Sequence, residues 1–306
     1  MMFKSIVDDI KREFTFGNKV TRLILINAAI WVSVNIVRLV FLISTGGSPG
    51  ESFNSFLKYI SLSPDLIFDL AHPWVFFTHM FVHVGFFHIL WNMLLLFWFG
   101  RILGGFLGDH RIYPVYFLSG IAGAILFLIA APLVTTGFGY GASAAVMGVV
   151  VAAAAIAPDY IMRLLFIGDV KLKYIALVLV VLDLFALGSM SNFLGHIAHL
   201  GGAAFGFAFV AMLKNGTDLS VPFNNLISWF GGLFSGEPRQ KKPRKKSSVF
   251  LRSSSGKPQR KKDSDSRQRP ADHQAKLDGI LDKIKSDGYE SLTEEEKEFL
   301  FQASKK

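Results

Sequence analysis

Long apolar stretches occupy most of the first two thirds of this 306-residue chain. A helix needs about 20 predominantly apolar residues to cross a bilayer, and all but one of these stretches approach or exceed that length. They therefore predict an all-α membrane protein with about six spans, at roughly 23–43, 75–100, 112–134, 142–157, 174–190 and 193–213. The stretch at 142–157 is short for a span. The first stretch is interpreted as a retained span because no small-residue cleavage site follows it.

Composition agrees with this interpretation. Hydrophobic residues make up 51% of the chain and charged residues 18%, against roughly 25% charged residues in soluble domains. Most of the charge lies in the last third of the chain, which excludes an ordinary soluble enzyme. Cysteine is absent, so a disulfide, a thiolate metal site and a cysteine nucleophile are also excluded.

The distribution of Lys and Arg predicts the orientation of the spans. Cationic residues cluster before span one and after spans two, four and six, and the alternate connections carry almost none. Because cytoplasmic loops are enriched in Lys and Arg, we expect both termini to lie in the cytoplasm. The formal net charge of +9 is thus explained by topology and by contact with membrane lipids, and we expect no nucleic-acid partner.

Changes in composition divide the chain into four parts. Residues 1–20 are expected to form a cytoplasmic amphipathic segment, and residues 21–214 a six-span domain. Residues 215–272 are predicted to be a basic disordered linker. Residues 273–306 are predicted to form a small helical hairpin, in which Thr293 and Glu296 make a capping box.

Polar residues recur at matched depth in three of the predicted spans. Within hydrocarbon such side chains are costly, so each is treated as a functional hypothesis. With the predicted orientation, spans two, four and six run in the same direction, and their polar residues fall in the outer leaflet. They are His79, His83, His88 and Asn92 in span two, Ser143 in span four, and His196 and His199 in span six.

Small residues predict that spans four and six touch. Ala198, Gly202 and Gly206 recur every four residues, a spacing that allows two helix backbones to approach closely. Such packing would bring Ser143 within hydrogen-bond reach of His199, as a nucleophile and its general base. His88 and Asn92 are four residues apart and therefore share a helical face, from which both can donate hydrogen bonds to a developing oxyanion.

Other interpretations of these side chains remain open. Ser and His also serve as polar contacts between helices, which is the first interpretation of His196. His79 and His83 are expected to be solvated residues at the membrane edge. A metal site made of several His residues is disfavoured because no carboxylate is expected nearby, Asp183 being on span five.

Three motifs in order resemble those of the rhomboid family of intramembrane serine proteases, over roughly residues 20–213. Gly141-Ala142-Ser143-Ala144 matches the family's G-x-S-x motif, and His88 with Asn92 matches its H-x-x-x-N. The stretch from Ala198 to Gly206 matches A-H-x-x-G-x-x-x-G.

The resemblance implies a six-transmembrane-helix rhomboid bundle and a Ser143/His199 dyad without an acidic third member. His88, Asn92 and the Ser143 backbone N–H would hold the oxyanion, and Gly141, Met147, His196 and Gly202 would support the site. It also implies hydrolysis of single-span or other membrane-protein substrates near the outer membrane face, with neither a metal nor a cofactor. The expected location is a bacterial inner or plasma membrane.

The sequence departs from the family pattern at three positions. Val75 follows Trp74 where the family often has Arg, Met147 replaces an aromatic residue that stacks under the catalytic His, and Gly104 replaces a Glu. With Met147, His199 is expected to be less firmly oriented. The alternative function is that of a non-catalytic rhomboid-like protein that binds transmembrane helices for trafficking or degradation. Such relatives typically lose the Ser or the His, and both are present here.

Overall fold

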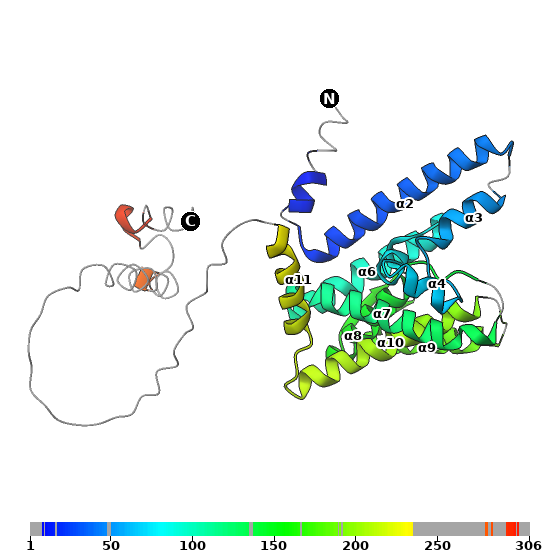
Figure 1. Ribbon diagram of the computed structural model, residues 1–306. Helices are drawn as coiled ribbons and strands as arrows, with labels where there is room; N and C mark the ends of the chain where they lie inside the picture. The colour runs from blue at the N-terminus through cyan, green and yellow to red at the C-terminus, as the bar shows by residue number, and fades with distance from the viewer. Residues whose placement is uncertain are drawn as a thin grey trace, which may run out of the picture. The chain divides into compact units, whose positions relative to one another are not determined.

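The computed structural model describes most of the chain between residues 8 and 234 and a few residues near its end (Figure 1). The described residues are 8, 10–15, 17–47, 50–134, 137–165, 167–188, 190, 192–234, 279–280, 283, 292–297 and 299. The chain divides into two units, Met1–Arg239 and Gln240–Lys306. Each unit is described by itself below.

The first unit is almost entirely helical. Its long helices are α2 (Lys19–Ser44), α6 (Phe86–Leu107), α7 (Ile112–Ala130), α8 (Ser143–Ile156), α9 (Leu172–Leu187) and α10 (Phe193–Lys214). Short helices precede α6, namely α3 (Gly50–Lys58), α4 (Leu66–Ala71), α5 (Val75–Thr78) and η1 (His79–Phe81). Two further 3₁₀ turns flank α7, namely η2 (Asp109–Arg111) and η3 (Ala131–Leu133). Span two of the sequence prediction therefore begins later than expected, at Phe86 instead of residue 75, because Gly85 caps the helix there.

Four helices of the described residues are long and apolar enough to cross a membrane. They are Lys19–Ser44, Phe86–Leu107, Asp109–Leu133 and Phe193–Lys214. The chain is therefore an integral membrane protein. The two other expected spans correspond to α8, with 14 residues, and α9, with 16 residues, both shorter than the roughly 20 residues that a span usually needs. The six-span count stays a prediction.

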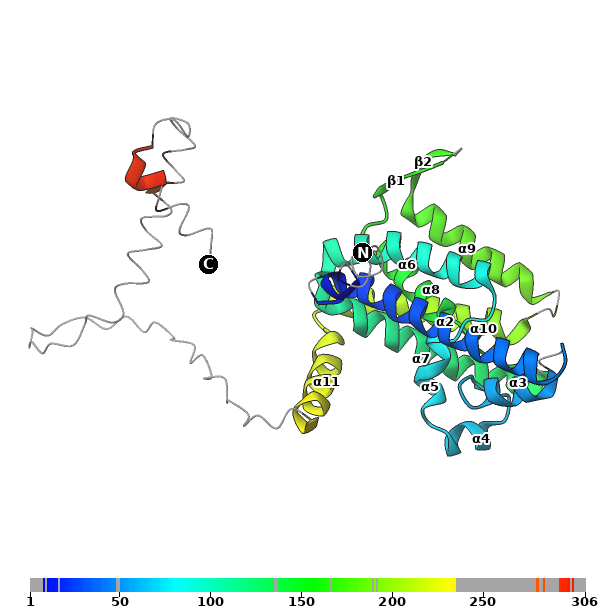
Figure 2. The ribbon, with the colours of Figure 1, turned by 90° about the horizontal axis from the view of Figure 1, so that it is seen from above.

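Helix α8 lies at the centre of the bundle. It packs against α6, α7, α9 and α10 (Figure 2), and 10 of its 14 residues are buried. Its sequence of Ala, Gly and Val allows neighbouring helices to approach closely. A helix enclosed by other helices exposes little backbone or side chain to lipid, so it tolerates a length that would be short for an isolated span. Helix α2 packs mainly against α6 at the edge of the bundle.

A short β-hairpin corrects the all-α prediction. Strands β1 (Ile161–Leu164) and β2 (Gly168–Lys171) pair antiparallel between α8 and α9, with Ile161 opposite Lys171. The loop before β1 carries Asp159, whose carboxylate binds the Nζ atoms of Lys171 and Lys173 at 3.0 and 2.9 Å. The periodicity of long apolar stretches does not detect strands of four residues.

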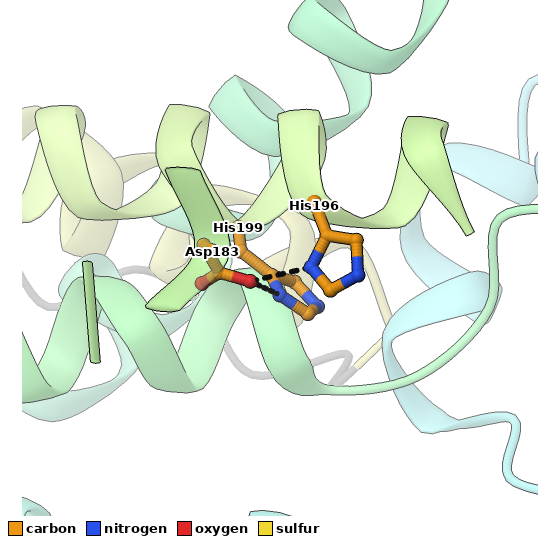
Figure 3. A group of neighbouring side chains, drawn as sticks. All are labelled: Asp183, His196 and His199. Atoms are coloured by element: carbon orange, nitrogen blue, oxygen red, sulfur yellow. Dashed lines mark hydrogen bonds and ion pairs between the residues drawn. The ribbon is translucent and has the colours of Figure 1, made fainter. Parts of the chain in front are cut away.

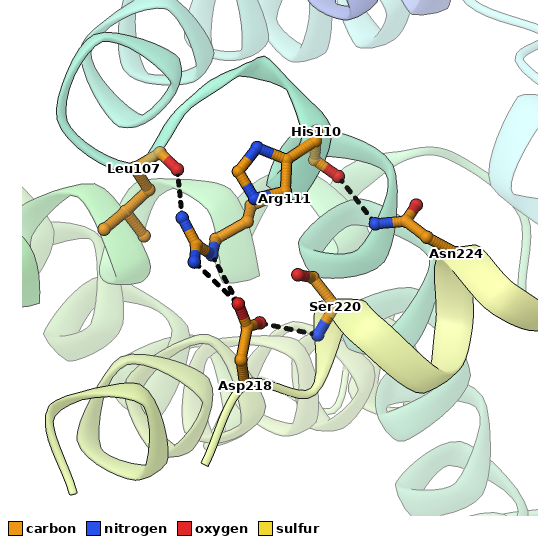
Figure 4. A network of polar contacts seen from close by, with 6 residues as sticks. All are labelled: Leu107, His110, Arg111, Asp218, Ser220 and Asn224. Atoms are coloured by element: carbon orange, nitrogen blue, oxygen red, sulfur yellow. Dashed lines mark hydrogen bonds and ion pairs between the residues drawn. The ribbon is translucent and has the colours of Figure 1, made fainter. Parts of the chain in front are cut away.

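Helix α11 (Ser220–Phe234) corrects the predicted linker, which was expected to be disordered from residue 215. Polar contacts fasten the start of α11 to the turn between α6 and α7 (Figure 4). Arg111 donates to Asp218 Oδ2 from Nε at 3.1 Å and from Nη2 at 2.6 Å, and the Ser220 backbone N–H donates to Asp218 Oδ1 at 2.9 Å. Asn224 Nδ2 donates to the His110 carbonyl at 3.2 Å. The rest of the predicted linker lies outside the described residues.

Breaking the contact between Arg111 and Asp218 should destabilise the fold in a pH-dependent way. Burial raises the pKa of Asp218, but hydrogen bonds from Arg111 and Ser220 outweigh it and lower that pKa to about 2. The pKa of this carboxyl in the unfolded chain is about 4, so its lowered pKa in the fold contributes its full stabilisation above about pH 4. This stabilisation is lost as the pH falls toward 2. We expect Arg111→Met to cost about 1–3 kcal/mol of unfolding free energy at pH 7 and much less near pH 2.

Thermal unfolding of the full chain in detergent at several pH values measures this effect. Arg163→Met is the matched control, because Arg163 pairs with Asp169 on the surface with side-chain exposures of 83% and 52%, and such pairs contribute about 0–1 kcal/mol. Equal losses in both variants, or a loss that does not change with pH, would contradict the prediction.

The predicted capping box is confirmed near the end of the chain. Glu296 Oε2 accepts from the Thr293 backbone N–H at 2.8 Å, and Thr293 Oγ1 accepts from the Glu296 N–H at 3.3 Å. Ile280 and Leu292 are buried within this unit. The remaining residues of the predicted hairpin lie outside the described part, as do most of residues 1–9 in the predicted amphipathic segment. Residues 10–15 are helical and exposed.

Candidate active site

Ser143 and His199 meet at the centre of the bundle. Ser143 is the first residue of α8, and His199 lies in the second turn of α10. His199 Nε2 is 2.6 Å from Ser143 Oγ, a short hydrogen bond between a hydroxyl and an imidazole. The two side chains are thus in direct contact, as the packing of their helices was expected to allow.

Small residues produce this contact. A Cβ atom added to Gly202 would overlap the carbonyl oxygen of Ala144, and one added to Gly206 would overlap that of Gly148. The backbones of α10 and α8 therefore touch along the spacing that the sequence indicated, and this packing prediction is confirmed. Gly202 lies opposite the residue that follows Ser143, so it sets the distance between α10 and the start of α8.

An acidic residue completes the arrangement, contrary to the expected dyad. Asp183 of α9 lies with Oδ1 at 2.9 Å from His199 Nδ1 and at 2.7 Å from His196 Nδ1 (Figure 3). His196 contacts Asp183 and not Ser143, so its expected supporting role is indirect. The sequence signal for Asp183 was its position as an ionisable residue within an apolar stretch. Its pairing with His199 was missed because helix rotation and helix contacts are not encoded in spacing along one span.

Among the residues that the structure describes, Asp183, His196 and His199 are also the group whose side chains could together hold a metal ion. The ligand atoms of Asp183, His196 and His199 all lie within 4.8 Å of one another. The expectation that no carboxylate lies near the histidines is therefore wrong. Both imidazole Nδ1 atoms contact Oδ1 of the carboxylate, an arrangement that hydrogen bonding by itself can hold together.

Two histidines hold the loop before Ser143. The Gly141 N–H donates to the His79 carbonyl at 2.8 Å, and the Ala142 N–H donates to His83 Nε2 at 3.2 Å. His79 and His83 are 4% and 0% exposed. The expectation that they are solvated at the membrane edge is wrong, because this loop covers them. Their place in the polar cluster of the predicted second span is the sequence signal for this role.

Glycines shape the same loop. Gly141 has φ +125°, and a Cβ there would lie 2.6 Å from His88 Cε1. Gly139 pairs with Leu62, each N–H donating to the other's carbonyl at 2.9 Å. The backbone before Ser143 is therefore held on one side by Leu62 and on the other by the histidines, and Gly141 is required both by its conformation and by the close approach of His88.

His88 and Asn92 of α6 face Ser143 across a cleft. The cleft has a volume of about 540 Å³ and is lined by Ser143, His199, His88 and Asn92, together with Phe87, Trp91, Leu95, Phe138, Gly139, Tyr140, Asn192 and Gly195. Asn92 Nδ2 donates to the His88 carbonyl at 2.8 Å and lies 3.5 Å from His83 Nε2. The three sequence motifs thus contribute to one cleft.

A second cavity of about 340 Å³ also reaches Ser143 and is lined by residues of α6, α8, α9 and α10. Met147 lines it together with Asp183, His196 and His199. Among the described residues, the ring contact of His199 is with His196, at 5.7 Å between centroids and nearly perpendicular. Met147 therefore lies at the site, as expected, and no described aromatic ring stacks under His199.

The other two departures from the family pattern lie away from the reacting groups. Val75 is fully buried, and its carbonyl accepts from His79 Nδ1 at 2.8 Å. A Cβ on Gly104 would lie 3.5 Å from the Ile112 side chain, which is ordinary van der Waals contact. Neither residue lines the cleft that contains Ser143.

Comparisons with known proteins agree with this geometry. Residues 71–216 match the family model of the Rhomboid domain, and residues 262–306 match a family of unknown function, DUF6576. "RHOMBOID-like protein 1" of Arabidopsis thaliana is 29% identical over 170 residues, which cover 54% of this chain and 41% of that protein. The chain thus spans less than half the length of this relative.

The domain match includes every residue that lines the cleft, from Phe87 to His199. The helical membrane bundle therefore contains a Rhomboid domain at residues 71–216, and the three motifs of the sequence meet at one cleft within that domain.

Proposed function

We propose that this protein is an intramembrane serine endopeptidase in which Ser143 is the nucleophile and His199 the general base. The observation that carries the proposal is the 2.6 Å contact between Ser143 Oγ and His199 Nε2. A serine hydroxyl is a weak nucleophile until an adjacent base takes its proton, and this contact has the geometry of such a pair. Nothing in the proposed chemistry uses a metal or a cofactor.

The reaction is acyl transfer to water. His199 Nε2 accepts the Ser143 proton as Oγ attacks the scissile carbonyl carbon, and the tetrahedral intermediate collapses when the protonated His199 gives that proton to the leaving amine. Water then attacks the acyl-enzyme, with His199 as base, and releases Ser143. Both steps return the enzyme to its starting protonation state.

Three groups are proposed to stabilise the oxyanion. The first N–H groups of an α-helix have no acceptor within the helix, and Ser143 supplies the first N–H of α8. His88 and Asn92 line the same cleft and carry further N–H donors. Donors of this kind contribute about 3–4 kcal/mol each to transition-state stabilisation when they are fixed in advance.

The proposed substrates are single-span or other membrane proteins, cut near the outer membrane face. The cleft beside Ser143 carries exposed aromatic residues, Phe87 and Trp91, with exposures of 72% and 59%. A transmembrane helix must unwind before its peptide bonds reach Ser143, so Gly or Pro near the cleaved bond should favour cleavage. We also propose that residues 21–214 form the catalytic domain and that the protein lies in a bacterial inner or plasma membrane. The Lys and Arg distribution supports the further proposal that both termini lie in the cytoplasm.

A serine-hydrolase probe tests the proposal without knowledge of the substrate. The purified full chain is treated with a fluorophosphonate, and the adduct is located by intact mass and peptide mapping. We expect one adduct on Ser143 that is absent after His199→Ala. A folded wild type that gives no adduct, beside a rhomboid protease that reacts in parallel, would favour the non-catalytic helix-binding alternative instead.

Removal of His88 should slow the reaction without unfolding the protein. We expect His88→Ala to lower kcat by roughly 10²–10³-fold, because one oxyanion donor is lost, with a change of less than about threefold in KM, because uniform binding is unaffected. His110→Ala is the control, since His110 is exposed at the other end of α6. Cleavage kinetics on a transmembrane substrate measure both variants, and an unchanged kcat in His88→Ala would remove His88 from the oxyanion site.

A further inference from the structure

Asp183 is an acidic side chain within an apolar helix. It is the single Asp or Glu of α9, and 11% of its side chain is exposed. An isolated carboxylate is costly in such surroundings unless it is paired and hydrogen-bonded. Its partners are the Nδ1 atoms of His199 and His196, both on Oδ1. Among the described residues, the hydrogen bonds to the carboxylate therefore come from two consecutive turns of α10.

The contact with Asp183 determines which nitrogen of His199 carries the proton. An ionised carboxylate only accepts hydrogen bonds, so an imidazole nitrogen at 2.9 Å from it must be the N–H donor. In a neutral imidazole the other nitrogen then has the free lone pair. That nitrogen is Nε2, which faces the Ser143 hydroxyl at 2.6 Å. The arrangement thus sets His199 in the tautomer that can accept the serine proton.

Asp183 also fixes the orientation of the His199 ring. The ring is held by hydrogen bonds at both nitrogens, one to α9 and one to α8. Met147 lies one turn after Ser143 and lines the cavity beside the His199 ring. Its flexible thioether constrains the His199 ring less than a stacked aromatic side chain would. Among the described residues, Asp183 is therefore the group that limits rotation of His199 from the side opposite Ser143.

We propose that Asp183 is a positioning residue that orients His199, fixes its Nδ1–H tautomer and stabilises the imidazolium that forms when His199 takes the Ser143 proton. The inference rests on the proposed function. Asp183 stays ionised throughout, the Nδ1 proton stays on His199, and no bond to Asp183 is made or broken. His196 is the second donor to the same carboxylate oxygen and keeps it fixed when His199 changes charge.

Asp183→Asn tests the proposal, because Asn has the same shape and can also donate to Nδ1, which would leave the proton on Nε2. We expect kcat for cleavage of a transmembrane substrate to fall by about 10²–10⁴-fold, with KM within about threefold and an unchanged Tm. Asp183→Glu, which keeps the acceptor, should recover at least about tenfold of that loss. Asp159→Asn is the matched control, since Asp159 lies in an exposed loop and binds two lysines there.

Nitrogen NMR of imidazole-labelled protein gives a readout that does not depend on activity. In the wild type we expect the nitrogen signals of His199 to be those of the Nδ1–H tautomer. In Asp183→Asn we expect them to shift toward those of the Nε2–H tautomer. The signals are assigned to His199 by their loss in His199→Gln. His196→Gln should leave the His199 tautomer unchanged and lower kcat by less than about tenfold, as expected for a group that acts through Asp183.

The outcomes separate the two proposals. An active wild type in which Asp183→Asn retains kcat within threefold would overturn the positioning role and leave the proposed function intact. An inactive wild type with the Nδ1–H tautomer, lost in Asp183→Asn, would overturn the proposed function and keep the positioning role. A stoichiometric metal in the purified chain, lost together with activity on chelation and absent from Asp183→Asn, would show that the cluster is a metal site and overturn the hydrogen-bonding role.

Discussion

Ser143→Ala should reduce cleavage of a transmembrane substrate to the uncatalysed background, a loss of about 10⁶-fold in kcat by analogy with removal of other serine nucleophiles. The variant loses the only atom that would form the acyl bond, and alanine at the first position of α8 keeps the helix. Among the described residues, the hydroxyl is hydrogen-bonded to His199, and the packing of α8 against α10 does not use it, so that packing should persist. The measurement is mass-spectrometric detection of substrate fragments after incubation in proteoliposomes.

Ser119→Ala is the matched control for this prediction. Ser119 lies on α7, is fully buried, and its Oγ has no hydrogen-bond partner within the part of the chain that the structure describes. Its loss should leave both cleavage and Tm nearly unchanged. If Ser143→Ala still cuts at more than about a hundredth of the wild-type rate, with contaminating proteases excluded, Ser143 is not the nucleophile.

Gly202→Val should separate α10 from α8, abolish activity and lower the stability of the fold. A Cβ at Gly202 would overlap the Ala144 carbonyl and lie 3.2 Å from its Cα, and backbone atoms cannot rotate away as a side chain can. Overpacking of this kind costs about 3 kcal/mol or more. For a domain of this size we expect Tm to fall by about 6–12 °C. Thermal unfolding in detergent and fluorophosphonate labelling of Ser143 measure the two effects.

Gly105→Val provides the comparison. Gly105 lies on α6, and a Cβ there has no heavy atom within 4 Å among the described neighbours. The same substitution should therefore change Tm by less than about 3 °C and leave labelling of Ser143 intact. Equal Tm values in the two variants would mean that α8 and α10 do not depend on the close approach at Gly202.

The periodic features of the chain were predictable from its sequence. Apolar length identified the long helices, because the thickness of a bilayer fixes how many residues a span needs. The four-residue spacing of Gly202 and Gly206 predicted a close helix contact, since residues four apart share a face. The capping box of Thr293 and Glu296 was predictable because it depends on residues three apart. Local spacing is sufficient where the interaction is local or repeats along one helix.

The extent of the short elements was not predictable in the same way. Apolar length predicts a second span from residue 75, and composition predicts a linker from residue 215, whereas α6 begins at Phe86 and α11 begins at Ser220. The start of α6 follows an extended Gly85 at its N-cap, whereas the start of α11 is held by contacts to another segment. The start of α11 depends on Arg111, which lies 107 residues away in the sequence.

The reacting pair was visible in the sequence, but its surroundings were not. Ser143, His199, His88 and Asn92 follow from motifs within single helices, each short enough to be seen in a few residues. Asp183 and His83 reach the site from other segments, and only tertiary packing brings Asp183 to His199 and His83 to the loop before Ser143. The sequence by itself determined which residues can react and which faces pack. The tertiary structure alone decided what holds those residues in place, because the rotation of a helix about its axis is set by all of its neighbours together.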